Sequence, residues 1–239
     1  MTTNETPADQ PGDRPSAPVP ARPAEPRDAA TVVVLRDTVE SGRGLEVYLI
    51  KRSRAVDFMA GAHVFPGGRL DKADSSLAAC AVRETFEEAG LVLDVAALVP
   101  WVRWVTPEIS PKRFDARFFL ARMPEGQEPR VDGYEATEGL WIAPQEALQC
   151  WEDGAMQFAP ATAKSVEMLL AFATVESALA EAARRVPPVV MPFVWNDKES
   201  GRAYISLPGD PRHPLPDVLG GNIRRFQLAE GRYRKVNAN

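Results

Sequence analysis

The segment that most constrains this chain is 67–91, GGRLDKADSSLAACAVRETFEEAGL, where two glycines precede a helical pattern rich in acids. Successive residues of an α-helix turn by about 100°, so Glu84, Glu87 and Glu88, at spacings of three and four, share one face. Arg83 stands one turn before Glu87 and can pair with it. The sequence therefore predicts a helix with three carboxylates on a single face.

The ends and the apolar side of this helix can also be predicted. Asp74 and Ser75 are residue types that suit the helix N-terminus, and Gly90 suits a left-handed stop just past its end. We expect the apolar side of the helix to face a core, and it consists of Leu77, Cys80, Ala81 and Phe86.

Three carboxylates on one face repel one another. At about 6 Å and an effective dielectric constant near 20, each pair costs roughly 3 kcal/mol before screening. A hard divalent cation such as Mg²⁺ or Mn²⁺ relieves this repulsion far better than one arginine, because such ions prefer carboxylate and carbonyl oxygens. The alternative is a solvated acidic helix face, where the repulsion falls to tenths of a kcal/mol.

The surrounding residues favour the cation, because they resemble the Nudix box, G-x5-E-x7-R-E-U-x-E-E-x-G-U, with U apolar. Asp74 occupies the first acidic position, eight residues rather than seven separate it from Arg83, and Thr85 replaces an apolar residue. The register from Arg83 onward is undisturbed. The matching positions are Gly68, Arg83, Glu84, Glu87, Glu88, Gly90 and Leu91.

The resemblance implies a Mg²⁺- or Mn²⁺-dependent hydrolase that cleaves the pyrophosphate bond of a nucleoside diphosphate linked to another group. It implies that Glu87, Glu88 and the main-chain carbonyl of Gly67 hold the metal. Glu84 completes the cluster, either as a metal ligand or as the group that orients the attacking water. Arg83 holds the glutamates in place through charge-assisted hydrogen bonds.

Nudix hydrolases commonly place a further acidic residue near the strand that ends at Trp141 in this chain. Glu135, six residues before Trp141, is the candidate for metal ligand or catalytic base. Glu138 competes with it, and either can instead be an exposed loop glutamate.

The order of predicted elements matches an α+β fold, the α/β/α sandwich of Nudix domains, with a mixed central sheet. The second helix begins near Pro144, which suits a first helical turn. Apolar and β-branched runs predict the strands 31–36, 45–51, 62–65, 97–105, 113–121 and 134–142.

Three regions follow from these patterns. Residues 1–28 hold seven of the 22 prolines and predict a disordered tail, 29–153 form the Nudix core, and 154–239 form a C-terminal extension packed on it. Within the extension we expect one helix, whole or broken, over 162–185 and two β-hairpins over 189–207 and 223–236.

The loop before the box bears on the substrate. Coenzyme A diphosphatases of this superfamily carry R-S-x3-R-x3-G-x3-F-P-G-G, and this chain keeps the spacing from Arg52 but has Asp57 at the second arginine. The resemblance therefore favours CoA or an acyl-CoA, with Arg52 and Arg113 as phosphate contacts and Phe114 as a stacking surface or core residue. The alternative substrates for the same chemistry are a nucleotide sugar, a dinucleotide or a damaged nucleotide. The alternative function is a non-catalytic, nucleotide-binding regulatory domain.

Net charge, apolar runs and cysteine count limit the kinds of partner that this chain is expected to bind. A net charge of −5 argues against broad binding to nucleic acid or membrane surfaces, and no run reaches the roughly 20 apolar residues that span a bilayer. Two cysteines, Cys80 and Cys150, are too few for a disulfide framework and fit a cytoplasmic protein, with Cys80 expected to be buried. The expected partner is a small nucleoside diphosphate derivative, and a homodimer is left open.

Overall fold

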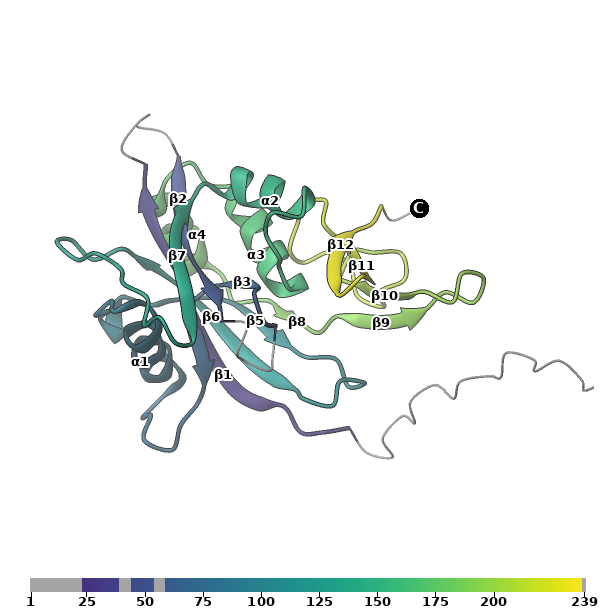
Figure 1. Ribbon diagram of the computed structural model, residues 1–239, viewed down its shortest axis with the longest axis horizontal. Coiled ribbons are helices and arrows are strands. Elements are labelled where there is room, and N and C mark those ends of the chain that lie inside the picture. The colour runs from purple at the N-terminus through teal and green to yellow at the C-terminus, as the bar shows by residue number, and fades with distance from the viewer. Residues whose placement is uncertain (1–22, 39–43, 54–58, 238–239) are drawn as a thin grey trace, which may run out of the picture.

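The computed structural model describes residues 23–38, 44–53 and 59–237. It is an α+β sandwich in which helices cover both faces of a mixed sheet, with a small second sheet beside it (Figure 1). The first half contains β1 (Arg27–Asp37), β2 (Leu45–Arg52), β3 (His63–Val64), β4 (Gly67–Arg69), α1 (Leu77–Ala89), η1 (Val95–Ala97), β5 (Val99–Val105), β6 (Phe114–Arg122) and β7 (Ala136–Ile142). The second half contains α2 (Pro144–Glu152), α3 (Pro160–Leu169), α4 (Val175–Arg184), β8 (Val189–Val190), β9 (Phe193–Asn196), β10 (Ala203–Ser206), β11 (Arg225–Ala229) and β12 (Arg232–Lys235).

The long strand β1 organises the central sheet. The strand order is β3-β2-β1-β6-β5-β8, with β4 paired to β1 and β7 paired to β2. One edge of β1 runs parallel to β6 along its length. The other edge is divided: β4 pairs antiparallel with 29–31, and β2 pairs antiparallel with 35–37. This division places Gly67 and Gly68 of β4 directly beside the central strand.

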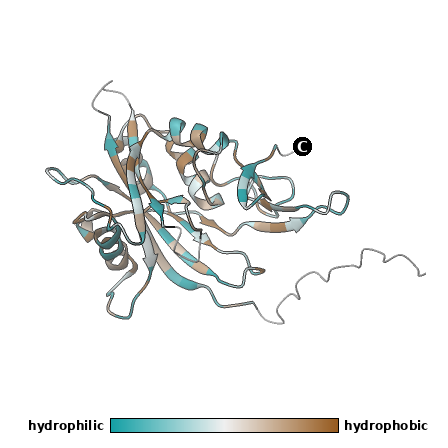
Figure 2. Ribbon diagram, in the orientation of Figure 1, coloured by the Kyte–Doolittle hydropathy of each residue, from teal (hydrophilic) through white to brown (hydrophobic). Residues whose placement is uncertain are grey.

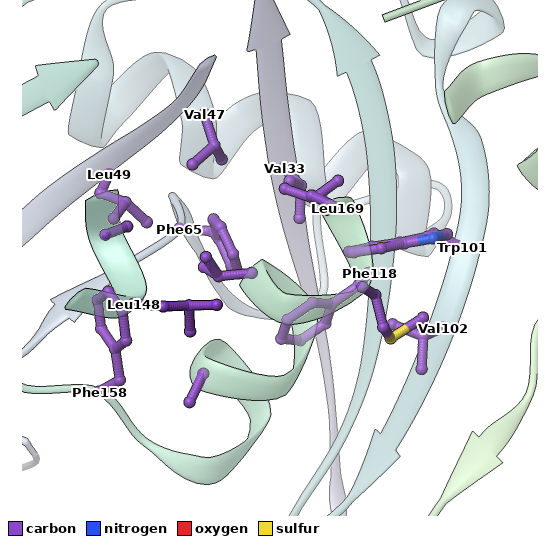
Figure 3. Packing of buried hydrophobic residues seen from close by; sticks show 14 of the residues in the cluster. Val33, Val47, Leu49, Phe65, Trp101, Val102, Phe118, Leu148, Phe158 and Leu169 are labelled. Atoms are coloured by element: carbon purple, nitrogen blue, oxygen red, sulfur yellow. The ribbon is translucent and has the colours of Figure 1, made fainter. Parts of the chain in front are cut away.

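Alternation along β1 builds two cores. Val32 and Val34 face α1, where they form one core with Cys80 and Ala81 of that helix. The predicted burial of Cys80 is therefore confirmed. Val33 and Leu35 face the opposite side, where α2, α3 and α4 cover the sheet. Figure 3 shows this larger core, in which the labelled residues are Val33, Val47, Leu49, Phe65, Trp101, Val102, Phe118, Leu148, Phe158 and Leu169. The predicted α/β/α sandwich is confirmed.

The predicted glutamate helix is α1, with two corrections. Its N-cap is Ser76, whose side chain accepts a hydrogen bond from Ala79 N, rather than Asp74 or Ser75. Phe86 is 56% exposed, and not part of the core as predicted, because Thr85 takes the buried position and bonds the carbonyl of Ala81. Gly90 ends the helix in the left-handed region as predicted, with φ of 66°. In Figure 2, α1 accordingly carries both hydrophilic and hydrophobic colour.

The strand ends in the structure differ by a few residues from the predicted ends where local hydrogen bonds decide them. β7 begins at Ala136 rather than 134, and β5 begins at Val99 because η1 takes residues 95–97. Most of the predicted tail, residues 1–22, lies outside the described residues, whereas Arg27 and Asp28 already belong to β1 and pair with β6. No helix in the part of the chain that the structure describes is long and apolar enough to cross a membrane.

In the C-terminal region the predicted helix over 162–185 is broken, and both predicted hairpins form, as β9–β10 and β11–β12. Two helices form, because the chain turns after Leu170 and α4 restarts with a capping box at Thr174 and Ser177. β8 joins the central sheet on β5, and the remaining strands form one four-stranded antiparallel sheet, β12-β11-β10-β9. Contacts between distant strands, which no local pattern reveals, decide this arrangement.

A buried ion pair ties α3 to the loop before β11. Lys164, 1% exposed, donates to Glu167 Oε2 at 2.6 Å and also to the carbonyl of Gly220. The other oxygen of Glu167 accepts the backbone N–H groups of Asn222 and Ile223, at 2.6 and 2.8 Å. One carboxylate thus orders a chain segment that is more than fifty residues away in sequence.

We expect Glu167→Ala to lower the free energy of unfolding by about 3–5 kcal/mol, because it leaves the Lys164 ammonium buried without its counter-charge. Urea denaturation of the two proteins measures this difference. The control is Glu230→Ala, which removes an exposed carboxylate and should change stability by less than about 0.5 kcal/mol. Equal effects of the two substitutions would contradict the account.

Candidate active site

The glycines of β4 lie directly against the glutamates of α1. The Gly67 N–H donates to Glu88 Oε2 at 2.9 Å. A Cβ atom at Gly68 would lie 2.4 Å from the carboxyl carbon of Glu84, so only glycine allows that carboxylate its position. The turn and the helix are thus fitted to each other at the two positions where the sequence places glycine.

Gly67 has no room for a side chain. A Cβ atom there would lie 2.5 Å from the carbonyl oxygen of Ala30 on β1. The bonds from Val32 N to Pro66 O and from Leu70 N to Asp28 O fix the alternation of the β1–β4 ladder. That alternation leaves the peptide groups of Gly67 outside the ladder, which is why its N–H can reach Glu88.

Arg83 connects three acidic side chains around the helix. It donates to Glu84 Oε1 and Glu87 Oε2 from one nitrogen, both at 2.9 Å. Its other side makes a two-point contact with Asp74, Nε to Oδ1 and Nη2 to Oδ2, again at 2.9 Å. These bonds lower the pKa of Asp74 to about 2, and the same contact with Asp74 is the main reason that the pKa of Arg83 is raised. Asp74 therefore anchors Arg83, despite the extra residue between them.

Burial controls the charge of two of the three glutamates. Glu88 is 5% exposed, and burial raises its pKa to about 7, against the lowering effects of the Gly67 N–H and of Arg52. Burial also raises the pKa of Glu84, although Arg83 opposes the shift. Glu87 differs from them, since its side chain is 54% exposed.

Glu135 joins this group electrostatically. It raises the pKa of both Glu84 and Glu88, although burial is the larger cause for each. The competing Glu138 instead forms an ion pair with Lys51 at 2.8 Å, on the part of β7 that pairs with β2. The structure therefore brings Glu135, rather than Glu138, towards the glutamates of α1.

The carboxylates suit a divalent cation in kind. Glu88 is a buried and Glu84 a partly buried oxygen donor, and their repulsion for each other and for Glu135 is only partly offset by Arg83 and Arg52. As the side chains stand, Glu87 turns to Arg83 and Glu88 to Gly67, and no three His, Cys, Asp or Glu side chains converge on one point within the described ranges. The donor set fits Mg²⁺ or Mn²⁺, which prefer oxygen ligands.

The three predicted substrate contacts are separated. Arg52 lies at the site, with one guanidinium nitrogen 3.9 Å from Glu88 Oε1. Arg113 is buried and donates to the backbone carbonyls of Thr106 and Ala24. Phe114 pairs with Arg27, four residues along β1 from the partner of Gly67, which is about 13 Å. Asp57, the substituted arginine position, lies outside the described residues.

Comparison with known proteins identifies the domain. The family model described as the NUDIX domain matches residues 25–162, more than half of the chain. The chain belongs to the Nudix family. A crystal structure of a NUDIX hydrolase from Alicyclobacillus acidocaldarius has a TM-score of 0.59 and 26% identity, covering 65% of this chain and 96% of that protein.

Two curated relatives also match. A nudix hydrolase of Caenorhabditis elegans is 28% identical over 51% of this chain, and the match spans only 53% of the worm protein. The acyl-coenzyme A diphosphatase NUDT19 of Xenopus laevis is 23% identical over 73% of each chain. The second match covers more of this chain than the NUDIX model does.

Sequence reasoning missed one residue that shapes the site. Asp132 accepts hydrogen bonds from the backbone N–H groups of Tyr134, Glu135 and Ala136, at 3.2, 3.0 and 2.9 Å. The Asp-Gly pair at 132–133 is a turn signal that could have indicated it.

A cavity of about 220 Å³ lies elsewhere, between the end of α2 and β12, and none of the predicted site residues lines it.

The Asp74–Arg83 contact yields a pH prediction. Asp74→Asn should lower the free energy of unfolding by about 1–2 kcal/mol at pH 7. Since the folded pKa of Asp74 is depressed, its contribution is fully present above its ordinary pKa of 3.8 and is lost as the pH falls towards about 2. Urea denaturation between pH 7 and pH 3 should show a constant difference that narrows below about pH 4.

The matched control is Glu176→Gln, which alters a carboxylate that is 81% exposed on α4 and should be nearly neutral throughout. A difference between wild type and Asp74→Asn that widened on acidification would contradict the proposed anchoring of Arg83.

Proposed function

We propose that this chain is a hydrolase that uses Mg²⁺ or Mn²⁺ to cleave the pyrophosphate bond of a nucleoside diphosphate-linked compound. The observation that carries the proposal is the packing of buried Glu88 and partly buried Glu84 against Gly67 and Gly68, where their charges are only partly balanced. A doubly charged cation would balance these carboxylates and would also bind the oxygens of a diphosphate.

The metal would be held by Glu84, Glu87, Glu88 and the carbonyl of Gly67. Bound there, it would supply positive charge to the phosphate oxygens and to the leaving phosphate. The protein contributes fixed positions: Gly68 leaves room for the carboxylate of Glu84, and the Gly67 N–H holds Glu88. Little of the binding energy is then needed to assemble the site.

The remaining residues handle the water and the positioning. We propose that Glu135 accepts the proton of the attacking water, with Glu84 as the alternative base. Arg83 acts through other residues: its bonds to Glu84 and Glu87 set their orientation, and Asp74 sets the orientation of Arg83. Arg52, beside Glu88, is the candidate contact for a substrate phosphate.

For the substrate we propose CoA or an acyl-CoA. The relative named acyl-coenzyme A diphosphatase aligns over 73% of this chain, and the spacing from Arg52 to the Phe-Pro-Gly-Gly turn resembles that branch. Asp57 departs from the pattern and would repel a phosphate that an arginine there would bind. This departure keeps a nucleotide sugar, dinucleotide or damaged nucleotide as the alternative substrate for the same chemistry.

A substrate panel tests the proposal. CoA, ADP-ribose, NADH and nucleoside triphosphates are incubated with the full chain and Mg²⁺, and the phosphate-containing products are quantified. We expect CoA or acyl-CoA to show the highest kcat/KM, with no turnover when EDTA is added. Faster turnover of ADP-ribose than of CoA would overturn the CoA assignment. Failure to hydrolyse any of them would favour the regulatory domain.

A pair of substitutions, one test and one control, shows whether hydrolysis depends on the glutamate cluster. Glu88→Gln should lower kcat by roughly 10²- to 10³-fold, because the amide removes a charged metal ligand at the buried centre. Glu176→Gln on α4 should leave turnover unchanged. Near-normal rates in Glu88→Gln would show that hydrolysis does not depend on this cluster.

A further inference from the structure

Tyr134 is an aromatic side chain held out in water. It is 82% exposed, more than any other aromatic residue in the described part of the chain. Tyrosine is intermediate in its tendency to be buried, and its ring is large enough to dominate packing where it is covered. No packing within the fold accounts for a ring in this position.

The backbone that carries Tyr134 is nevertheless firmly held. Asp132 accepts hydrogen bonds from the backbone N–H groups of Tyr134 and of the two residues after it. Burial alone would raise the pKa of Asp132, but these hydrogen bonds stabilise its charged form and lower the pKa overall. The N–H of Ser53 also donates to the carbonyl of Glu135 at 2.8 Å, which joins the turn to the end of β2. A well-fixed backbone that presents an exposed ring is an arrangement suited to binding, since little order is lost when a ligand arrives.

The turn lies beside the buried glutamates. Ala136 pairs with Arg52 across β7 and β2, and Arg52 places a guanidinium nitrogen 3.9 Å from Glu88. Glu135, the neighbour of Tyr134, interacts electrostatically with Glu84 and Glu88. Tyr134 is therefore the chain neighbour of the proposed base, in the turn that adjoins Arg52 and the glutamates of α1.

We propose that Tyr134 is a specificity-determining residue that stacks on the nucleobase of the substrate, and that Asp132 is the positioning residue that holds it there. The inference rests on the proposed function and adds the place of the base to it. A flat aromatic ring is a general platform for nucleobases, because every base has a π-face. The carboxylates beside it supply no comparable surface for an uncharged ring.

Binding of AMP and of ribose 5-phosphate tests this directly, since the two compounds differ only in the base. Isothermal titration calorimetry in Mg²⁺ should show that wild type binds AMP more tightly. Tyr134→Leu should weaken AMP binding roughly 5- to 100-fold and change ribose 5-phosphate binding less than about 2-fold. Tyr134→Phe keeps the ring and should retain the AMP affinity, and all three proteins should fold alike because the site is exposed.

The positioning role of Asp132 has its own readout. Asp132→Ala should reduce AMP affinity in the same way as Tyr134→Leu, whereas Asp132→Asn, which keeps one oxygen acceptor, should restore part of it. A uniform loss for AMP and ribose 5-phosphate in Asp132→Ala would indicate a general structural effect instead.

The outcomes separate this inference from the proposed function. Equal affinity of wild type for AMP and ribose 5-phosphate, or an undiminished preference in Tyr134→Leu, would overturn the inference even if the substrate panel shows turnover. A base preference that Tyr134→Leu removes would support it even if no diphosphate is hydrolysed. Loss of the preference in Phe114→Leu, with Tyr134→Leu unaffected, would place the base on β6 and overturn it.

Discussion

The arrangement around the site depends on holding Glu88, and most of Glu84, out of water against the glycines of β4. Burial raises the pKa of both side chains, and the available positive groups, Arg83 and Arg52, offset only part of that cost. Charged groups are expensive to bury unless they are paired or bound to metal. The fold accepts this cost at one place, where the central strand, the turn and the helix meet.

Neighbouring features follow from that constraint. Gly67 and Gly68 are small because the backbone of β1 and the carboxylate of Glu84 approach them too closely for a side chain. Asp74 is spaced one residue differently from the family pattern and still reaches Arg83 at two points. The helices α2–α4 cover the opposite face of the sheet, so they stabilise the strands without entering the site (Figure 1).

Local patterns predicted much of this from sequence. The spacing of the glutamates gave the acidic face of α1, and Gly90 gave its end, because both depend on residues within one or two helical turns. Phe86 was predicted to be buried because it is apolar and threonine is polar. Thr85 is buried instead, because its hydroxyl donates a hydrogen bond to the Ala81 carbonyl. The four-stranded sheet depends on pairing between distant strands, and Asp132 acts through backbone groups, so neither leaves a periodic pattern.

The most direct measurement of the central claim is a titration of the full chain with Mn²⁺, followed by electron paramagnetic resonance of the free ion. The account predicts saturable binding at pH 7 that is strongly weakened in Glu84→Gln and in Glu88→Gln and unchanged in Glu176→Gln. If wild type takes up no Mn²⁺, or if the two glutamine variants bind it as wild type does, the buried carboxylates are not a metal site.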